Sequence, residues 1–200
     1  MPRLIDTERR RRDIAAATWR LARRDGLDAV SVRNVAKEAG LSAGSLRHVF
    51  STQADLLTFA MAALAERVTE RQRALEPADT PLEAAADMLA QLLPLDDERQ
   101  REAEVWFAFV VRARVDPQLR ALGERIDAGL RELVRDALAP LELADADLAV
   151  EEVFALVDGL ALHAVLQPAK SAPETMHRVL HGHLERLVRQ APRAAPEQIP

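Results

Sequence analysis

The chain has no cysteine and no tyrosine among its 200 residues, and aromatic residues make up only 4% of it. Without cysteine it forms neither a disulfide nor a thiolate metal site, which is consistent with a reducing cytoplasm. Strand-forming residues are sparse, whereas alanine, leucine, arginine and glutamate dominate, and this composition favours an all-α protein. No run of 18 or more residues lacks a charged side chain, so we expect no transmembrane helix. No continuous apolar segment follows the N-terminal arginines, so we expect no secretory signal either.

The sequence also lacks the motifs on which most enzymes depend. It has no glycine-rich phosphate loop, no nucleophile motif and no complete set of metal ligands. Paired carboxylates such as Asp96 and Asp97 are adjacent, so on a helix they point apart. His177 and His181 are four residues apart, which suits one metal ion, but no third ligand has the right spacing; a surface or dimer-interface helix is the preferred interpretation. We therefore predict no catalytic residue, no metal and no cofactor.

Charge is divided unequally along the chain, whose net charge is −5. Residues 1–50 hold 11 arginine and lysine residues and 6 aspartate and glutamate residues, for a net charge of +5. Residues 51–200 hold 16 basic and 26 acidic residues, for a net charge of −10. A basic head on an acidic body is typical of a DNA-binding domain joined to a body with another task. The alternative is a solvated charged face.

Residues 32–50 have the pattern of two short helices joined by a tight turn, the geometry that places a helix in the major groove of DNA. Ala36 is small where the helices approach each other, Gly40 is expected to have a positive φ at the turn, and Ser42 is expected to cap the second helix. The apolar residues at helical spacing, expected to face the core, are Val32, Val35, Ala36, Ala39, Leu46, Val49 and Phe50. The residues left to face outward are Ser45, Arg47 and His48.

Apolar residues recur at helical spacing along the rest of the chain, and prolines, glycines and capping residues separate the segments. Thr7 is expected to cap the first helix. We predict nine helices over about residues 7–25, 31–40, 43–49, 52–75, 80–93, 97–115, 117–139, 145–166 and 173–190. The predicted domains are a helix-turn-helix DNA-binding domain over residues 1–51, a ligand-binding and dimerisation domain over residues 52–190, and a flexible tail over residues 191–200.

The chain resembles the TetR family of transcriptional regulators, most specifically over about residues 10–57. The matching positions are Ile14, Ala17, Gly26, Val30-Ser31-Val32-Arg33, Val35-Ala36, Glu38-Ala39-Gly40-Leu41-Ser42, Gly44-Ser45-Leu46, Phe50 and Leu56-Leu57. A weaker similarity to the subgroup that includes choline-responsive repressors covers part of the body. Its positions are Trp106-Phe107-Ala108-Phe109, Asp116-Pro117 and Asp158-Gly159-Leu160-Ala161-Leu162.

The resemblance implies an Ω-like homodimer of nine-helix chains. In such a dimer helices 1–3 bind DNA, helices 4–7 enclose a pocket for a small-molecule effector, and the last two helices pair with those of the partner. Effector binding moves helix 4, changes the spacing of the two recognition helices and releases the operator. The implied function is a ligand-responsive repressor that binds a palindromic operator on double-stranded DNA.

Two departures from the family motivate a competing interpretation, a helical small-molecule-binding module without specific DNA recognition. Arg47 stands where the family usually has tyrosine, and Gln53 stands where it usually has lysine. Arg47 retains the ability to bind phosphate or guanine, whereas Gln53 retains a hydrogen-bond donor without the charge. The predicted DNA-binding residues are Ser31, Arg33, Ser42, Ala43, Gly44, Ser45, Arg47, His48, Thr52 and Gln53. For Arg47 the alternative is a solvated surface position, and for His48 it is a surface or packing position.

The four arginines at residues 9–12 have two interpretations of their own. They form either an arm that reaches the minor groove of DNA or a solvated first turn of the first helix.

The candidate effector-binding residues lie on four of the predicted helices. They are Met61, Leu64, Met88, Trp106, Phe107, Phe109, Arg112, Asp158 and His163. Aromatic residues at helical spacing either line a pocket or belong to the core. Arg112 pairs either with an anionic ligand or with a surface carboxylate. Asp158 and His163 interrupt an otherwise apolar helix, so each is either a pocket group or a polar group of the dimer interface.

Overall fold

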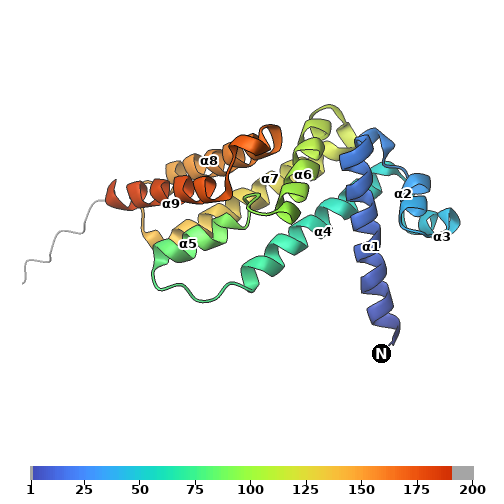
Figure 1. Cartoon of the computed structure of the whole chain (residues 1–200), viewed down its shortest axis with the longest axis horizontal. Helices are drawn as coiled ribbons and strands as arrows, with labels where there is room; N and C mark the ends of the chain where they lie inside the picture. The colour runs from blue at the N-terminus through green and yellow to red at the C-terminus, as the bar shows by residue number, and fades with distance from the viewer. Residues whose placement is uncertain (1, 191–200) are drawn as a thin grey trace, which may run out of the picture. The chain divides into compact units, whose positions relative to one another are not determined.

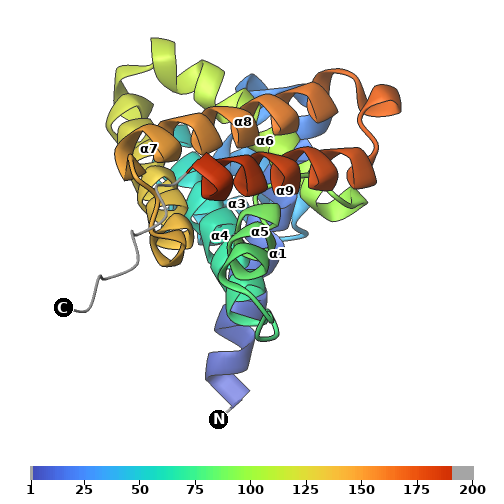
Figure 2. The ribbon, with the colours of Figure 1, turned by 90° about the vertical axis from the view of Figure 1, so that its left-hand side faces the viewer.

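The computed structural model describes residues 2–190, with side chains from Glu8 onward, and is drawn as a ribbon in Figures 1 and 2. Within that range it contains nine α-helices and no strand, so the all-α prediction is confirmed. The helices are α1 (Pro2–Asp25), α2 (Val32–Glu38), α3 (Ala43–Arg47), α4 (Gln53–Arg73), α5 (Pro81–Ala90), α6 (Asp97–Val115), α7 (Pro117–Leu138), α8 (Ala146–Leu166) and α9 (Pro173–Gln190). Short 3-10 helices cover Leu27–Ala29, Ala139–Leu141 and Pro168–Lys170.

The helix that departs most from its predicted start is α1. It begins at Pro2, so Thr7 lies inside the helix and the prediction that it forms the cap is wrong. Proline is well suited to the first turn of a helix because it has no backbone N–H to leave unsatisfied there. The predicted tail over residues 191–200 lies outside the described residues.

Side-chain caps fix the beginnings of the helices that follow. The Ser31 hydroxyl accepts a hydrogen bond from the Asn34 amide at 3.2 Å, at the start of α2. Thr52 accepts one from the Asp55 amide at 3.1 Å, and the Asp55 carboxylate accepts one from the Thr52 amide at 2.8 Å. The bond from the Thr52 amide lowers the pKa of the Asp55 carboxyl, because it stabilises the charged form. Reciprocal bonds of this kind form a capping box at the start of α4.

The chain divides into two compact units, which we describe separately. The first unit contains the described residues up to Ala74 together with Asp96–Asp127, and the second contains Leu75–Leu95 together with the described residues from Ala128. Helices α1 to α4 therefore share one core with α6. The predicted border after residue 51 does not coincide with the border between the two packing units, and as a border between two functions it stays a prediction. Among residues 2–190, no helix combines the length and the apolar character needed to cross a bilayer.

The core of the first unit brings the three N-terminal helices against α4 and α6. Its fully buried large side chains include Leu46 of α3, Leu56 of α4 and Phe109 of α6. The core of the second unit lies between α5, α7, α8 and α9, where Leu89, Leu180 and Leu184 are fully buried. Helices α8 and α9 lie side by side in this unit, as Figures 1 and 2 both show.

A buried carboxylate ties α4 to α6 within the first unit. Glu102 of α6 is 7% exposed, and its oxygens accept hydrogen bonds from Arg67 at 2.6 Å and from Arg71 at 2.8 Å. The Arg67 guanidinium also lies 5.4 Å from the ring centre of Trp19, whose indole N–H donates to the Ala60 carbonyl at 3.2 Å. This network joins α1, α4 and α6 through charge and hydrogen bonds as well as apolar contact.

Substituting Glu102→Gln is expected to lower the free energy of unfolding by about 1–3 kcal/mol, because two arginines lose the charge that compensates their partial burial. The measurement is urea unfolding followed by circular dichroism. Glu98→Gln is the matched control, since Glu98 also pairs with Arg67 but its side chain is 63% exposed. Its expected cost is about 0–1 kcal/mol. Equal losses in the two variants would show that burial of Glu102 adds nothing to the stability.

Candidate nucleic-acid interface

The turn between α2 and α3 has the backbone geometry that the sequence predicted. Gly40 has a φ of 67°, in the left-handed region that favours glycine. The Leu41 amide donates to the Ala36 carbonyl at 2.8 Å, which closes the end of α2. Ser42 then caps α3, because its hydroxyl accepts a hydrogen bond from the Ser45 amide at 3.1 Å. The two helices are therefore joined by a turn that local interactions define at both ends.

Helix α3 contains only five residues, so tertiary packing must hold it in place. Leu46 is 0% exposed and Phe50 is 6% exposed, and both join the core of the first unit. Val49, in contrast, is 64% exposed, so the prediction that it faces the core is wrong. The physical reason is angular. Ala43, Leu46 and Phe50 define the inward face, and Val49 precedes Phe50 by about 100° of rotation, outside that face.

The basic residues of α2 and α3 have no acidic partner among the described residues, in contrast to those in the last part of α1. Arg33, Lys37 and Arg47 are exposed, and none of them pairs with a carboxylate of the described residues. On α1, Arg20 pairs with Glu38 at 2.8 Å and Arg24 pairs with Asp25 at 2.8 Å. The hydrogen bond from Arg20 lowers the pKa of Glu38, which therefore stays ionised and neutralises that part of the surface.

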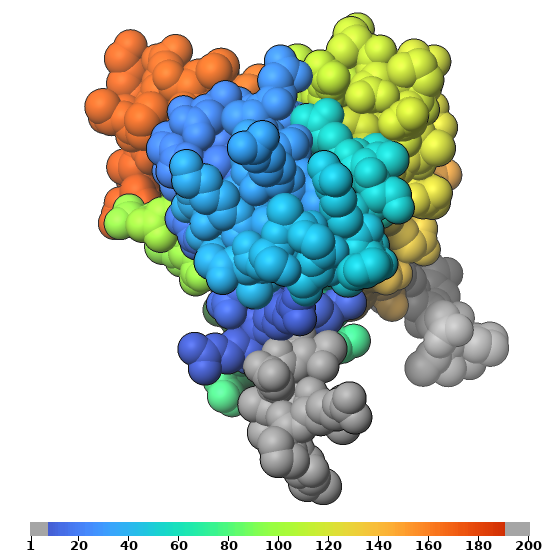
Figure 3. Space-filling view, turned by 90° about the vertical axis from the view of Figure 1, so that its right-hand side faces the viewer, coloured from blue at the N-terminus to red at the C-terminus, as the bar shows by residue number. Residues whose placement is uncertain are grey.

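The space-filling view in Figure 3 shows α2, α3 and the start of α4, coloured blue to cyan, on one face of the first unit. Arg33 and Arg47 are predicted DNA-binding residues, whereas the sequence pattern did not indicate Lys37. Lys37 is exposed in the last turn of the short helix α2, beside the glycine turn, and this position identifies it as a further candidate for DNA contact.

The arginines at residues 9–12 lie inside α1 and beyond its first turn, so the prediction that they form that turn is wrong, whereas a contact with the minor groove stays a prediction. Arg10 donates a hydrogen bond to the hydroxyl of Ser45 on α3. The guanidinium of Arg11 lies 5.1 Å from the ring centre of Phe59. These contacts bring positive charge from α1 to α3, and Ser45, which was expected to be free, is engaged and half-buried.

The remaining predicted DNA-binding residues already have local roles. The hydroxyls of Ser31, Ser42 and Thr52 accept the cap hydrogen bonds, so each retains its own O–H as a donor. Gln53 donates from Nε2 to the Leu27 carbonyl at 2.6 Å. That bond leaves one further amide hydrogen for another acceptor. Gly44 and His48 are exposed on α3 and at its end, and Ala43 is half-buried.

Six of the candidate effector-binding residues belong to the first unit. Met61 and Phe109 are buried in its core, and Trp106 stacks on Phe109 with ring centres 6.1 Å apart. Leu64 and Phe107 are half-buried. Arg112 pairs with Asp28 at 3.2 Å and with Asp116 at 3.5 Å, so in this structure it makes the surface ion pairs that the sequence offered as the alternative.

The other three candidates belong to the second unit. Met88 is half-buried and packs against its core, Asp158 is half-buried, and His163 is exposed. His163 is therefore not a buried charge within the protomer. The role of all nine residues in effector binding stays a prediction.

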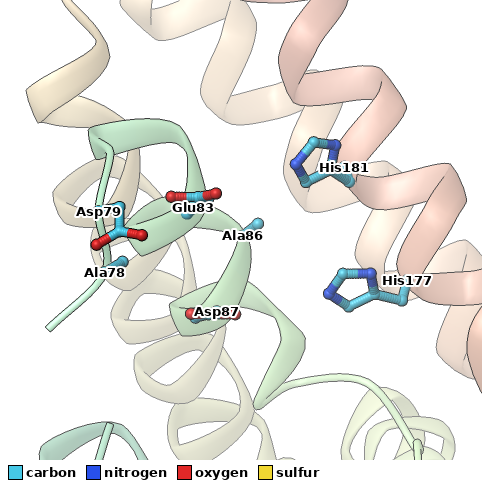
Figure 4. Close-up of a pocket in the computed structure, with 7 residues that line it drawn as sticks. All are labelled: Ala78, Asp79, Glu83, Ala86, Asp87, His177 and His181. Carbon is cyan, nitrogen blue, oxygen red and sulfur yellow. The ribbon is translucent and has the colours of Figure 1, made fainter. Parts of the chain in front are cut away.

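A hollow of about 340 Å³ lies between α5 and α9 in the second unit (Figure 4). Its lining residues are Ala78, Asp79, Glu83, Ala86, Asp87, His177 and His181. The two imidazole rings stack with centres 6.3 Å apart, and the His181 Nδ1 lies 3.4 Å from a Glu185 carboxylate oxygen. Among the described residues, no three histidine, aspartate or glutamate side chains are placed to hold one metal ion.

Comparison with known proteins matches both parts of the chain. Residues 14–58 match the family model of bacterial regulatory proteins of the tetR family, and residues 81–189 match that of the BetI-type transcriptional repressor C-terminal domain. The HTH-type transcriptional regulator PksA of Bacillus subtilis is 44% identical over 92% of this chain and 93% of its own length. BetI of Vibrio parahaemolyticus is 28% identical over 93% of this chain and 96% of its own.

Solved structures of transcriptional regulators have a similar fold. A transcriptional regulator from Rhodococcus has a TM-score of 0.81 at 34% identity, covering 92% of this chain and 99% of its own. A transcriptional regulator from Saccharomonospora viridis, solved in complex with choline, has a TM-score of 0.74 at 22% identity, covering 92% and 98% of the two chains, and shows the same fold.

The two capped helices and the left-handed glycine turn form a helix-turn-helix motif, and the named relatives of the chain are helix-turn-helix transcriptional regulators. Specifically, the chain belongs to the TetR family of bacterial transcriptional regulators, with a TetR-type DNA-binding region and a BetI-type C-terminal ligand-binding region.

Substituting Gly40→Ala is expected to lower the free energy of unfolding by about 1–2 kcal/mol, since a Cβ at positive φ strains the backbone. Nothing lies within 4 Å of a Cβ at this position, so the backbone conformation alone causes the loss. Gly44→Ala is the control in the same motif, because Gly44 is helical and a Cβ there also meets nothing within 4 Å. Thermal melting should show a gain or no change for Gly44→Ala. A Gly40→Ala variant as stable as the wild type would contradict the strain argument.

Proposed function

We propose that the protein is a ligand-responsive repressor that binds a palindromic DNA site as a homodimer and leaves it when a small molecule binds. The observation that carries the proposal is the exposed end of α3. Arg47 and His48 project from it, and neither pairs with a described acidic residue. DNA supplies the negative charge that this face lacks.

The predicted DNA-binding residues divide by the contact that each can make. Arg47 reaches a guanine edge or a phosphate, and His48 donates to either. Arg33, Ser31 and Thr52 lie at the starts of α2 and α4, where they suit phosphate contacts. Gln53 and Ser45 each form a hydrogen bond within the protein, so each of them helps to position the DNA-binding face as well as offering a contact to DNA.

Release by an effector follows from differential affinity. A small molecule that binds the DNA-incompetent arrangement of the dimer more tightly than the competent one lowers the operator affinity. The ratio of its affinities for the two arrangements limits the size of this effect. We assign the effector contacts to the candidate residues given above other than His163, and a mostly apolar ligand suits their composition. The buried network of Glu102 with Arg67 and Arg71 fixes α4 to α6, so movement of α4 must strain or rearrange it.

Substituting Arg47→Ala is expected to weaken specific DNA binding about tenfold or more, because a bidentate arginine contact contributes about 1–3 kcal/mol. Sites are first selected from random DNA with the wild-type protein, and affinities are then measured by fluorescence anisotropy at fixed salt. Arg101→Ala, which removes an exposed arginine from α6, is the control and should bind as the wild type does. A wild-type protein that prefers no sequence over random DNA would exclude the repressor and favour the binding module.

The dimer is proposed to form through α8 and α9. Residues 148, 152, 155, 159, 162 and 166 share one face of α8 at alternating spacings of four and three, and none of them is buried in the protomer. Leu148 is 55% exposed and Leu166 is 66% exposed on that face, and Ala155 and Gly159 between them permit close approach of another helix. His163 is exposed beside this face, which supports its assignment to the dimer interface.

Substituting Gly159→Leu is expected to shift the protein from dimer to monomer, because a bulky side chain separates the helices that meet there. A Cβ on Gly159 meets nothing within 4 Å in the protomer, so folding should be preserved. Gly129→Leu is the matched control, since Gly129 is helical on α7 and equally uncrowded. The measurement is size-exclusion chromatography with light scattering over a range of concentrations. Unchanged dimers in the Gly159→Leu variant would place the interface elsewhere.

A further inference from the structure

Val49 is a large apolar side chain that does not pack into the core of the protein. It lies two residues beyond the end of α3, its amide donates to the Leu46 carbonyl at 3.0 Å, and its side chain is 64% exposed. The other large apolar side chains of this segment, Leu46 and Phe50, are buried. Hydrating an isopropyl group is unfavourable, so a valine at this position gains most from a partner that covers it.

The surroundings of Val49 restrict what that partner is. The preceding residues, Arg47 and His48, are exposed and have no acidic partner among the described residues. Arg10 of α1 adds positive charge to this surface, because it donates a hydrogen bond to Ser45 of α3. A basic surface with one apolar side chain on it suits a polyanion that carries an apolar group, and it does not suit the apolar face of another protein.

The major groove of DNA displays one such group. The C5 methyl of thymine is apolar, whereas the other base edges present hydrogen-bond donors and acceptors that a valine would desolvate without compensation. Valine also has a stiff side chain, so little rotamer freedom is lost when it is covered.

We infer that Val49 is a specificity-determining residue that contacts the C5 methyl group of a thymine in each half-site of the operator. The inference rests on the proposed function, since it requires that α3 enters the major groove. It adds one base preference that the polar residues of α3 do not supply.

Replacing thymine by deoxyuridine tests this directly, because the change removes only the methyl group. The wild-type protein first selects its sites from random DNA, and each thymine of the best site is then replaced in turn at fixed salt. At one thymine per half-site we expect the wild-type affinity to fall about fourfold, the effect of exposing one methyl group. For Val49→Ala the same replacement should change the affinity by less than about twofold.

Val111→Ala is the matched control. Val111 is 68% exposed on α6, and its variant should keep the full sensitivity to deoxyuridine. Circular dichroism and thermal melting establish that the variants fold. Val49→Thr is a second variant, which keeps the shape of the side chain and replaces one methyl by a hydroxyl, and it should also reduce the sensitivity.

The possible outcomes distinguish a failure of the proposed function from a failure of the assignment of Val49. If the wild type selects no DNA sequence, the proposed function fails. If it selects a site but no thymine methyl contributes, or if Val49→Ala and Val49→Thr keep the wild-type sensitivity, the assignment of Val49 is overturned and the regulator stands.

Discussion

The burial of Leu46 and Phe50 is the constraint on which the DNA-binding surface depends. A helix of five residues has too few internal hydrogen bonds to persist alone, so α3 exists where the core of the first unit accepts these two side chains. Once they are buried, the direction of every other side chain on α3 follows from helix geometry. Arg47, His48 and Val49 are exposed because the opposite face is occupied.

The basic side chains near Leu46 and Phe50 fall into two groups, those that pair with carboxylates and those that do not. On α1, arginines that lie near carboxylates are neutralised, as with Arg20 and Glu38. On α2 and α3 the basic side chains remain unpaired among the described residues, so their favourable interactions are left for a ligand. The overall charge of the chain is negative, which shows that the position of charge, and not its sum, indicates a DNA-binding protein.

The same unit that holds α3 also contains the ion pairs between α4 and α6. Glu102 is stable as a buried carboxylate only while Arg67 and Arg71 stay in place, so a movement of α4 relative to α6 must break or replace these ion pairs. A regulator needs such an element, because an effector changes DNA affinity only if the protein has distinct arrangements between which it discriminates.

The sequence by itself determined the longer helices, the turn at Gly40 and the cap at Ser42, because these depend on groups within a few residues of one another. Only the tertiary structure decided the exposure of Val49 and the bond from Gln53 to Leu27, 26 residues away in the chain. Which positions of a short helix face inward, and which distant groups meet, depends on how elements pack around a common core. No local pattern contains that information.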